Sequence, residues 1–155
     1  MFNQRLTDKF SFSEAIDCYN KALEIDPTDT LLFINKGISL NYLCNTNEAI
    51  SSFNRALELN PYESTALTHK GIAISKFGAH SEALDYIDKA LQINPYDYAA
   101  LVWKGNYLEM QKDDLYAAIR YYGEALKINP QDHIIKAKIR IIGRKILERE
   151  FQESY

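Results

Sequence analysis

Apolar residues recur at three- and four-residue steps along most of this chain, which is the spacing typical of amphipathic helices. Between residues 30 and 63 the pattern occurs twice. The first run predicts a helix that ends near residues 44–47 and contains Leu31, Leu32, Phe33, Ile34, Ile38 and Leu40. The second run contains Ala49, Ile50, Phe53, Ala56 and Leu57. It must stop before Pro61, because proline disfavours helical geometry in the residue that precedes it. The segment is therefore predicted to be a helical hairpin.

This hairpin pattern repeats. The hexapeptide Ala-Leu-Glu-Ile-Asp-Pro at residues 22–27 returns with small changes at residues 56–61, 90–95 and 125–130. Its prolines, Pro27, Pro61, Pro95 and Pro130, are separated by 34, 34 and 35 residues. A fixed period of this length predicts a solenoid, in which each unit completes its core only by stacking on its neighbours.

Two further features keep the same phase. Ser13, Asn47 and Ser81, each followed by Glu and Ala, are predicted N-caps of the second helices. The first helices carry a central glycine at Gly37, Gly71 and Gly105. Since glycine destabilises a helix interior by about 0.5–1 kcal/mol, we expect these positions to mark close approach of the partner helix. The small residues expected on the other side are Ala49, Ala83, Ala118, Ala56, Ala90 and Ala125.

With these positions in place, the chain resembles the tetratricopeptide repeat family. The second unit matches the family pattern at Phe33, Gly37, Leu40, Ala49, Phe53, Ala56 and Pro61. The third matches at Leu67, Gly71, Ile74, Ala83, Ile87, Ala90 and Pro95, and the fourth at Leu101, Gly105, Leu108, Ala118, Tyr122, Ala125 and Pro130. The resemblance implies an all-α, right-handed α-solenoid of about three and a half repeats plus a C-terminal capping helix. Its expected bounds are 1–29 for a truncated repeat, then 30–63, 64–97 and 98–132, and 133–151 for the cap.

The chain departs from the family pattern in three places. The first repeat retains Ala15, Tyr19, Ala22 and Pro27, but its first helix lacks the opening turn. The fourth repeat has one extra residue near 112–116, which we expect to lengthen the turn between its helices. Lysine replaces the usual leucine at the seventh position, in Lys36, Lys70 and Lys104. We interpret these lysines as packing residues whose ammonium groups reach water, with a basic binding strip as the alternative.

The final segment combines an apolar stripe with a basic one. Asp132 is a predicted cap, and the stripe that would cover the fourth repeat is Ile135, Ile139, Ile142 and Ile146. The same helix carries five cations without an acid between residues 133 and 147: Lys136, Lys138, Arg140, Arg144 and Lys145. They indicate either a solvated face or a docking patch for an acidic partner.

Composition excludes several function classes. The 155 residues carry a net charge of −3 with a pI of about 5.6, which argues against a nucleic-acid-binding protein. No apolar run is long enough for a membrane span, and no secretory signal is recognisable, so we expect a cytoplasmic protein. Cys18 and Cys44 match no metal spacing, and we expect both to be small packing residues. We find no catalytic motif, and predict no enzyme activity, no metal and no cofactor.

The resemblance also implies where a partner would bind. In the family, the first helices line a concave groove, and the corresponding residues here are strongly apolar. The predicted groove residues are Leu31, Ile34, Asn35, Ile38, Asn41, Tyr42, Thr68, His69, Ile72, Lys76, Val102, Trp103, Asn106 and Met110, extended on the last helix by Ile134, Ala137 and Ile141. Some family members grip a terminal carboxylate with basic residues. Of the comparable positions here only Asn35 matches, so this mode is disfavoured.

The favoured hypothesis is a protein-interaction module that binds a peptide or helix through apolar contacts. The alternative is a self-assembling scaffold that forms a homo-oligomer through the truncated N-terminal edge, at Phe2, Leu6, Phe10 and Phe12. An RNA-binding helical repeat is a third hypothesis, disfavoured because the chain before Asp132 has 12 Lys/Arg against 17 Asp/Glu.

Overall fold

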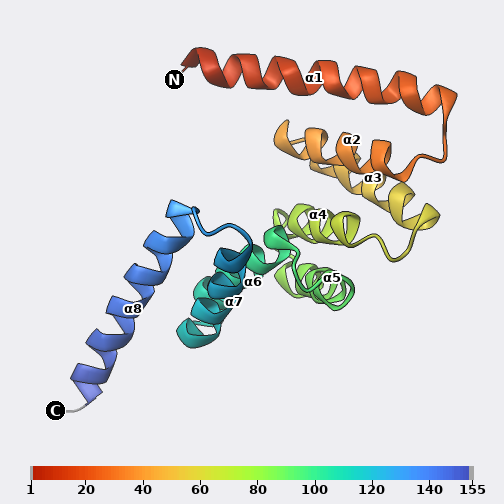
Figure 1. Ribbon diagram of the computed structural model, residues 1–155. Helices are drawn as coiled ribbons and strands as arrows, with labels where there is room; N and C mark the ends of the chain where they lie inside the picture. The colour runs from red at the N-terminus through yellow and green to blue at the C-terminus, as the bar shows by residue number, and fades with distance from the viewer. Residues whose placement is uncertain (1, 154–155) are drawn as a thin grey trace. The chain divides into compact units, whose positions relative to one another are not determined.

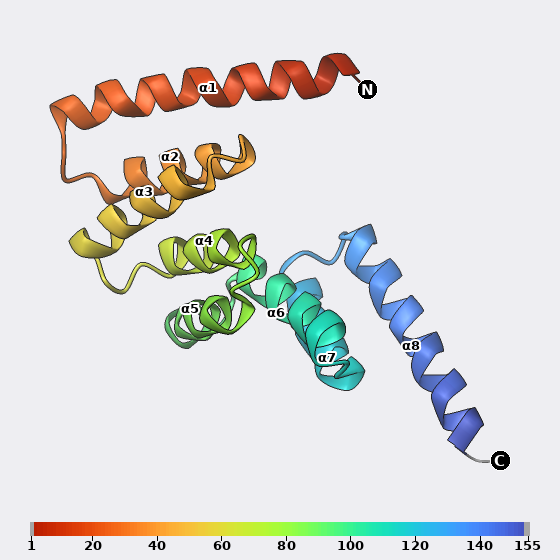
Figure 2. The same ribbon diagram turned by 180° about the vertical axis from the view of Figure 1, so that it is seen from behind.

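The computed structural model describes the backbone of residues 2–153 and the side chains of residues 11–152 (Figures 1 and 2). Over this range the fold is all-α, which confirms the predicted class. Its eight helices are α1 (Phe2–Ile25), α2 (Thr30–Tyr42), α3 (Thr46–Leu59), α4 (Ser64–Ser75), α5 (His80–Ile93), α6 (Tyr98–Gln111), α7 (Leu115–Ile128) and α8 (His133–Glu153). The chain divides into two compact units, Met1–Asn94 and Pro95–Tyr155.

Helical hairpins form both units. In the first unit α2 pairs with α3 and α4 with α5, while α1 packs on α2; in the second, α6 pairs with α7 and α8 packs on α7. The second helices end one residue before Asn60, Asn94 and Asn129, whose backbone leaves helical geometry directly before proline. The predicted stop of the second helix before Pro61 is therefore found, since the residue before proline is forced towards extended geometry.

Ser13 was predicted to cap the start of a second helix in the first repeat. This prediction is wrong, because Ser13 lies inside α1, a single 24-residue helix. Each complete hairpin turns at a residue with positive φ: Cys44 (64°), Gly78 (79°) and Asp113 (51°). The repeat places Phe10 at the equivalent position, and a bulky aromatic residue is strongly disfavoured there. Since residues 2–25 also contain neither glycine nor proline, nothing in the segment breaks the helix.

The two cysteines were predicted to be packing residues, and the structure corrects this prediction. Cys44 is exposed at its turn, and Cys18 is exposed on α1, so neither is a packing residue. The extra residue of the fourth repeat does not lengthen the turn, which spans residues 112–114. It lengthens α6, which has 14 residues against 12 in α4 and 13 in α2.

The helix caps were predicted with mixed success. Asn47 and Ser81 lie inside α3 and α5, whose N-cap positions are Asn45 and Ala79 and have no side-chain cap bond, so those two assignments are wrong. Asp132 does cap α8, because its Oδ1 accepts from the backbone N–H groups of residues 134 and 135 at 2.8 and 2.9 Å. Asp29, Asp97 and Asp114 also cap their helices, and these caps were not predicted from the sequence.

The core of each hairpin is built on the central glycine of its first helix. A Cβ added to Gly37 would lie 2.6 Å from the Phe53 ring, and one added to Gly105 would lie 2.6 Å from the Tyr122 ring. At Gly71 the nearest atom would be the Ala83 carbonyl oxygen at 3.0 Å. The predicted close approach is therefore confirmed. In two of the three hairpins, however, the closest atoms belong to a large ring rather than to the alanines, all of which are buried.

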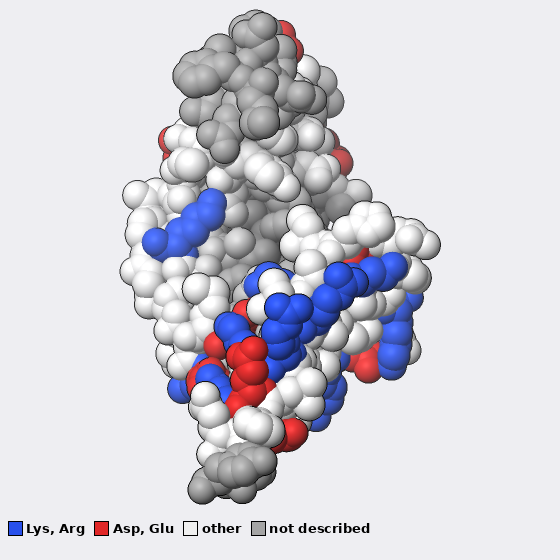
Figure 3. All heavy atoms as spheres, turned by 90° about the vertical axis from the view of Figure 1, so that its left-hand side faces the viewer, with Lys and Arg blue, Asp and Glu red and all other residues white. Residues whose placement is uncertain are grey.

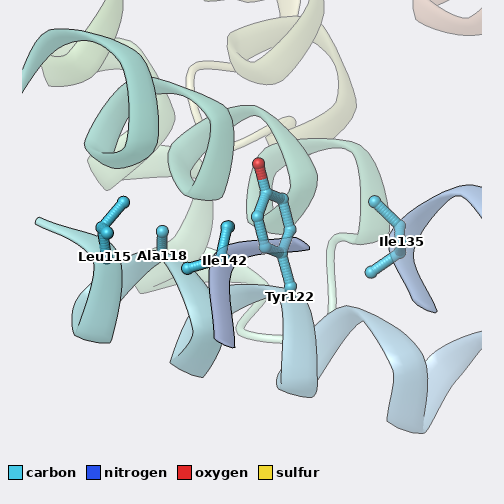
Figure 4. Packing of buried hydrophobic residues seen from close by; sticks show 5 residues of the cluster. All are labelled: Leu115, Ala118, Tyr122, Ile135 and Ile142. Atoms are coloured by element: carbon cyan, nitrogen blue, oxygen red, sulfur yellow. The ribbon is translucent and has the colours of Figure 1, made fainter. Parts of the chain in front are cut away.

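The same rings connect each hairpin to the helix that follows. In the first unit the Phe53 ring stacks on His69 of α4, with 6.0 Å between ring centroids. In the second unit Tyr122 packs with Leu115 and Ala118 of α7 and with Ile135 and Ile142 of α8 (Figure 4). One side chain thus stabilises both its own hairpin and the contact with the next element.

The glycine contact gives a direct test. Gly105→Ala should lower the free energy of unfolding by about 1–3 kcal/mol, because the added methyl group overlaps the Tyr122 ring. Gly123→Ala is the matched control. Gly123 lies inside α7 with no atom within 4 Å of its added Cβ, so this change should be neutral or stabilise by up to about 1 kcal/mol. Urea denaturation measures both values, and equal effects of the two substitutions would contradict the packing role of Gly105.

Candidate functional site

In the first unit, α2 presents an exposed apolar face at the predicted groove positions. Leu31 is 64% exposed and Tyr42 is 65% exposed. Ile38 lies between them in sequence and is half-buried. Residues seven and eleven positions apart lie on one side of a helix. We call Leu31, Ile38 and Tyr42 the α2 apolar face.

Other predicted groove residues of this unit belong to its interior. Ile34 is only 2% exposed and packs with Ala56 and Ala66, and Thr68 is fully buried. Neither side chain presents a surface to a partner. Asn35 is exposed, while Ile72 and His69 are half-buried.

A polar bridge and an aromatic stack border the α2 apolar face. Lys76 Nζ donates to the Asn41 side-chain oxygen at 2.5 Å and to the Asn41 carbonyl oxygen at 3.0 Å, which joins the ends of α4 and α2. Phe12 of α1 stacks on Tyr42 with 4.7 Å between ring centroids and 4° between planes. Both rings are thereby oriented by contacts within the chain.

The predicted oligomer edge is only partly visible. Phe12, one of its four residues, is half-buried and makes the stack with Tyr42. The side chains of Phe2, Leu6 and Phe10 lie outside the described residues. The uninterrupted α1 helix also removes the truncated hairpin that motivated this edge.

In the second unit the predicted groove positions have different roles. Met110 is 74% exposed at the end of α6, whereas Val102 is half-buried against the core cluster. Trp103 stacks on Tyr107 of the same helix, with 5.4 Å between ring centroids. On α8, Ile134 and Ile141 are 72% and 54% exposed, and Ala137 is also exposed.

Asn106 participates in a polar network that the sequence analysis missed. The Tyr122 hydroxyl lies 2.8 Å from both Asn106 Oδ1 and Glu109 Oε2. Lys138 of α8 donates to the same Glu109 oxygen at 3.0 Å and to the Tyr122 hydroxyl at 3.3 Å. The network therefore anchors α8 on the α6–α7 hairpin. It uses the polar groups of Asn106 and Glu109, which are then not available to a partner.

The network perturbs its titratable groups. Burial opposes ionisation of Glu109, but hydrogen bonds from Lys138 and Tyr122 outweigh it and hold the pKa of Glu109 below its ordinary value. Burial and the hydrogen bond to Glu109 raise the pKa of the Tyr122 hydroxyl. Tyr122 therefore remains a proton donor to the carboxylate at neutral pH.

Further polar contacts tie the start and end of α8 to the same hairpin. Tyr98 donates to the Asp132 carboxylate, and burial together with this bond raises the pKa of Tyr98 to about 12. Near the C-terminal end, Arg149 Nη1 lies 2.9 Å from Asp113 Oδ2. The Tyr116 hydroxyl lies 2.6 Å from a Glu150 carboxylate oxygen.

The lysines at the seventh position of the repeats are packing residues in two hairpins. Lys70 Nζ lies 4.4 Å from the centroid of the Tyr86 ring, and Lys104 Nζ lies 4.8 Å from that of Tyr121. These cation–π contacts join the two helices of a hairpin. The interpretation of the lysines as packing residues is confirmed for Lys70 and Lys104.

The described part of the chain also contains no candidate metal site and no candidate membrane span. Within it, no group of three or more His, Cys, Asp or Glu residues could hold a metal ion. None of its helices has the length and apolar character needed to cross a bilayer.

Comparisons with known proteins agree with this architecture. One tetratricopeptide repeat model matches residues 35–98, and a second matches residues 6–29 and 98–132. The chain belongs to the tetratricopeptide repeat family, whose repeats are protein–protein interaction modules and typically non-catalytic scaffolds. A comparison with curated proteins gave no match.

Solved structures share the fold. A crystal structure of MamA has a TM-score of 0.71 at 22% identity, covering 92% of this chain and 82% of that chain. A second MamA structure has a TM-score of 0.68 at 23% identity, covering 96% of this chain and 80% of its own. The first tetratricopeptide domain of Spaghetti (RPAP3), bound to the HSP90 peptide SRMEEVD, has a TM-score of 0.67 at 20% identity and covers 79% of this chain and 96% of that chain.

The Glu109 network predicts how stability depends on pH. Because the folded state lowers the pKa of Glu109, its ionised form stabilises the fold above the unfolded pKa, and this contribution is lost as pH falls through the folded value. Glu109→Gln should therefore lower the free energy of unfolding by about 1–3 kcal/mol at pH 7. The difference from the parent should shrink below about pH 4. Urea titrations from pH 3 to 7 test this, and a difference that does not change with pH would exclude the role of the carboxylate.

Proposed function

We propose that this chain binds a segment of a partner protein through the α2 apolar face, by inserting apolar side chains of the partner between Leu31 and Tyr42. The main support is exposure: two large apolar residues on one side of α2 are about two-thirds exposed, while the opposite side of the same helix is packed in the core. Exposed apolar surface of this kind marks interaction sites.

The bordering groups suit recognition of a polypeptide. Tyr42 is held by its stack on Phe12, so little side-chain entropy would be lost when a partner packs on it. The Lys76–Asn41 bridge places an ammonium and an amide at the end of the α2 apolar face, where they could also bond a partner's backbone. Rigid aromatic anchors beside polar groups are common among binding hot spots.

The partner segment we infer is apolar rather than a terminal carboxylate. The RPAP3 domain, which is similar in fold, is bound to the HSP90 peptide SRMEEVD, which contains two glutamates and an aspartate. Here the positions comparable to a carboxylate clamp are Ile34, Ile38, Thr65 and His69, and Ile34 is buried. Only Asn35 matches. We therefore do not expect this chain to capture SRMEEVD.

The test compares two exposed apolar residues of the same unit. Leu31→Gln should weaken partner binding at least tenfold, since burying a leucine side chain contributes about 1.5–3 kcal/mol. Ile25→Gln is the control, because Ile25 is 87% exposed and lies outside the α2 apolar face. A photo-crosslinking residue at each position, followed by mass spectrometry, identifies the partner, and titration with the purified partner gives both affinities.

Three results decide the proposal. Crosslinking from position 31 but not from position 25, with loss of affinity only in Leu31→Gln, supports it. Equal crosslinking from both positions, or unchanged affinity of Leu31→Gln, removes the α2 apolar face from the function. Circular dichroism should show the parent's helix content in both variants, because both side chains are exposed.

A further inference from the structure

The outer side of α8 carries a row of cations. α8 packs on α7 through Ile135 and Ile142, with Ile139 and Ile146 half-buried against the same cluster. Lys136, Arg140 and Arg144 are all exposed and follow one another at four-residue steps, so they lie on one side of the helix, away from the buried isoleucines. We call these three residues the basic stripe. Figure 3 shows Lys and Arg side chains gathered on the side of the molecule where α8 lies.

The basic stripe differs from Lys138 and Arg149, two of the three other cations of α8. Lys138 is paired with Glu109, and Arg149 is paired with Asp113. In contrast, no ion pair or hydrogen bond joins the basic stripe to another side chain in the described part of the protein. Three like charges about 6 Å apart repel one another, so an anion placed along them gains from all three.

The side chains of the basic stripe exclude the packing of another repeat helix on this side of α8. In the complete repeats, a first helix meets its partner through a large apolar residue at position four and the glycine at position eight. Counted the same way from His133, α8 has Lys136 and Arg140 at these positions. Arg140 fills the space that the ring of a second helix needs, as the contacts at Gly37 and Gly105 show. A solenoid layer from a second copy therefore does not fit this side of α8.

We propose that the basic stripe is a docking site for an acidic segment of a partner protein, separate from the α2 apolar face. The spacing of the cations along α8, about 6 Å, is close to the roughly 6.6–6.8 Å between alternate residues of an extended chain. A segment with Asp or Glu at alternate positions would thus place one carboxylate at each cation. Leu147 lies on the same side of α8 and is 66% exposed, so an apolar residue can follow the acids.

Size and charge favour a peptide over a larger polyanion. The basic stripe spans only about 12 Å. The whole chain carries a net charge of −3, which repels nucleic acid and anionic membranes at longer range. A short acidic segment meets the three cations while covering less of the remaining acidic surface than a long polyanion would.

The test uses a fluorescein-labelled peptide, ESESESL, and its neutral counterpart, QSQSQSL, in anisotropy titrations at about 20 mM salt, where screening is weak. The parent should bind the acidic peptide and not the neutral one, and added salt should weaken binding. Lys136→Glu/Arg140→Glu/Arg144→Glu should weaken binding at least tenfold. Lys21→Glu/Lys112→Glu/Lys127→Glu, which changes net charge equally at exposed sites elsewhere, should weaken it much less.

Each other result overturns the proposal. Unchanged binding in the triple variant of the basic stripe would show that another surface of the protein holds the peptide. No binding of ESESESL up to millimolar concentration would exclude an acidic segment. Stripe-dependent binding of a uridine dodecamer or of phosphatidylserine vesicles without peptide binding would assign the surface to another class of partner. Leu31→Gln should bind ESESESL as the parent does, so failure of this proposal is distinguishable from failure of the α2 apolar face.

Discussion

The contact between the glycine of a first helix and the large side chain of its second helix is the constraint on which both units depend. Phe53 and Tyr122 fit because Gly37 and Gly105 have no side chain, and each ring also packs on the helix that follows. Hairpin formation and stacking on the next element therefore share the same atoms. Within each unit, this sharing couples the formation of a hairpin to the packing of the next helix.

The two units use this contact with different chemistry. Phe53 is surrounded by apolar groups and an imidazole, whereas Tyr122 adds a hydroxyl that reaches Asn106, Glu109 and Lys138. The hydroxyl converts a purely apolar contact into a charged network that holds α8. This has a cost for binding, because Asn106 and Glu109 are then committed within the chain. The α2 apolar face takes no part in such a charged network: Leu31 and Tyr42 remain about two-thirds exposed, although Tyr42 stacks on Phe12.

Sequence periodicity was sufficient for the fold class, the hairpins and the role of the glycines, because these features recur in phase. Periodicity was insufficient where a single residue determines the backbone path, or where the orientation of one side chain determines whether it is buried. The continuity of α1 was not predicted, because the first repeat keeps the periodic residues of a second helix and only the single residue Phe10, where the other repeats turn, departs from them. The family pattern placed both Ile34 and Leu31 in the binding groove, yet Ile34 is buried and Leu31 is exposed. The partnership of Lys138 with Glu109 joins residues 29 positions apart, so only a three-dimensional structure could show it.

The corner residues have a mechanical consequence. In the complete repeats, a residue with positive φ lets the chain turn back into two short antiparallel helices. In the first repeat, which has no such turn, the same length of sequence forms one straight helix. The 24 residues of α1 extend roughly 36 Å without a joint. Because no turn divides the helix, the stack of Phe12 on Tyr42 and the packing of Ile16 against the core hold the whole of α1 as one rigid element.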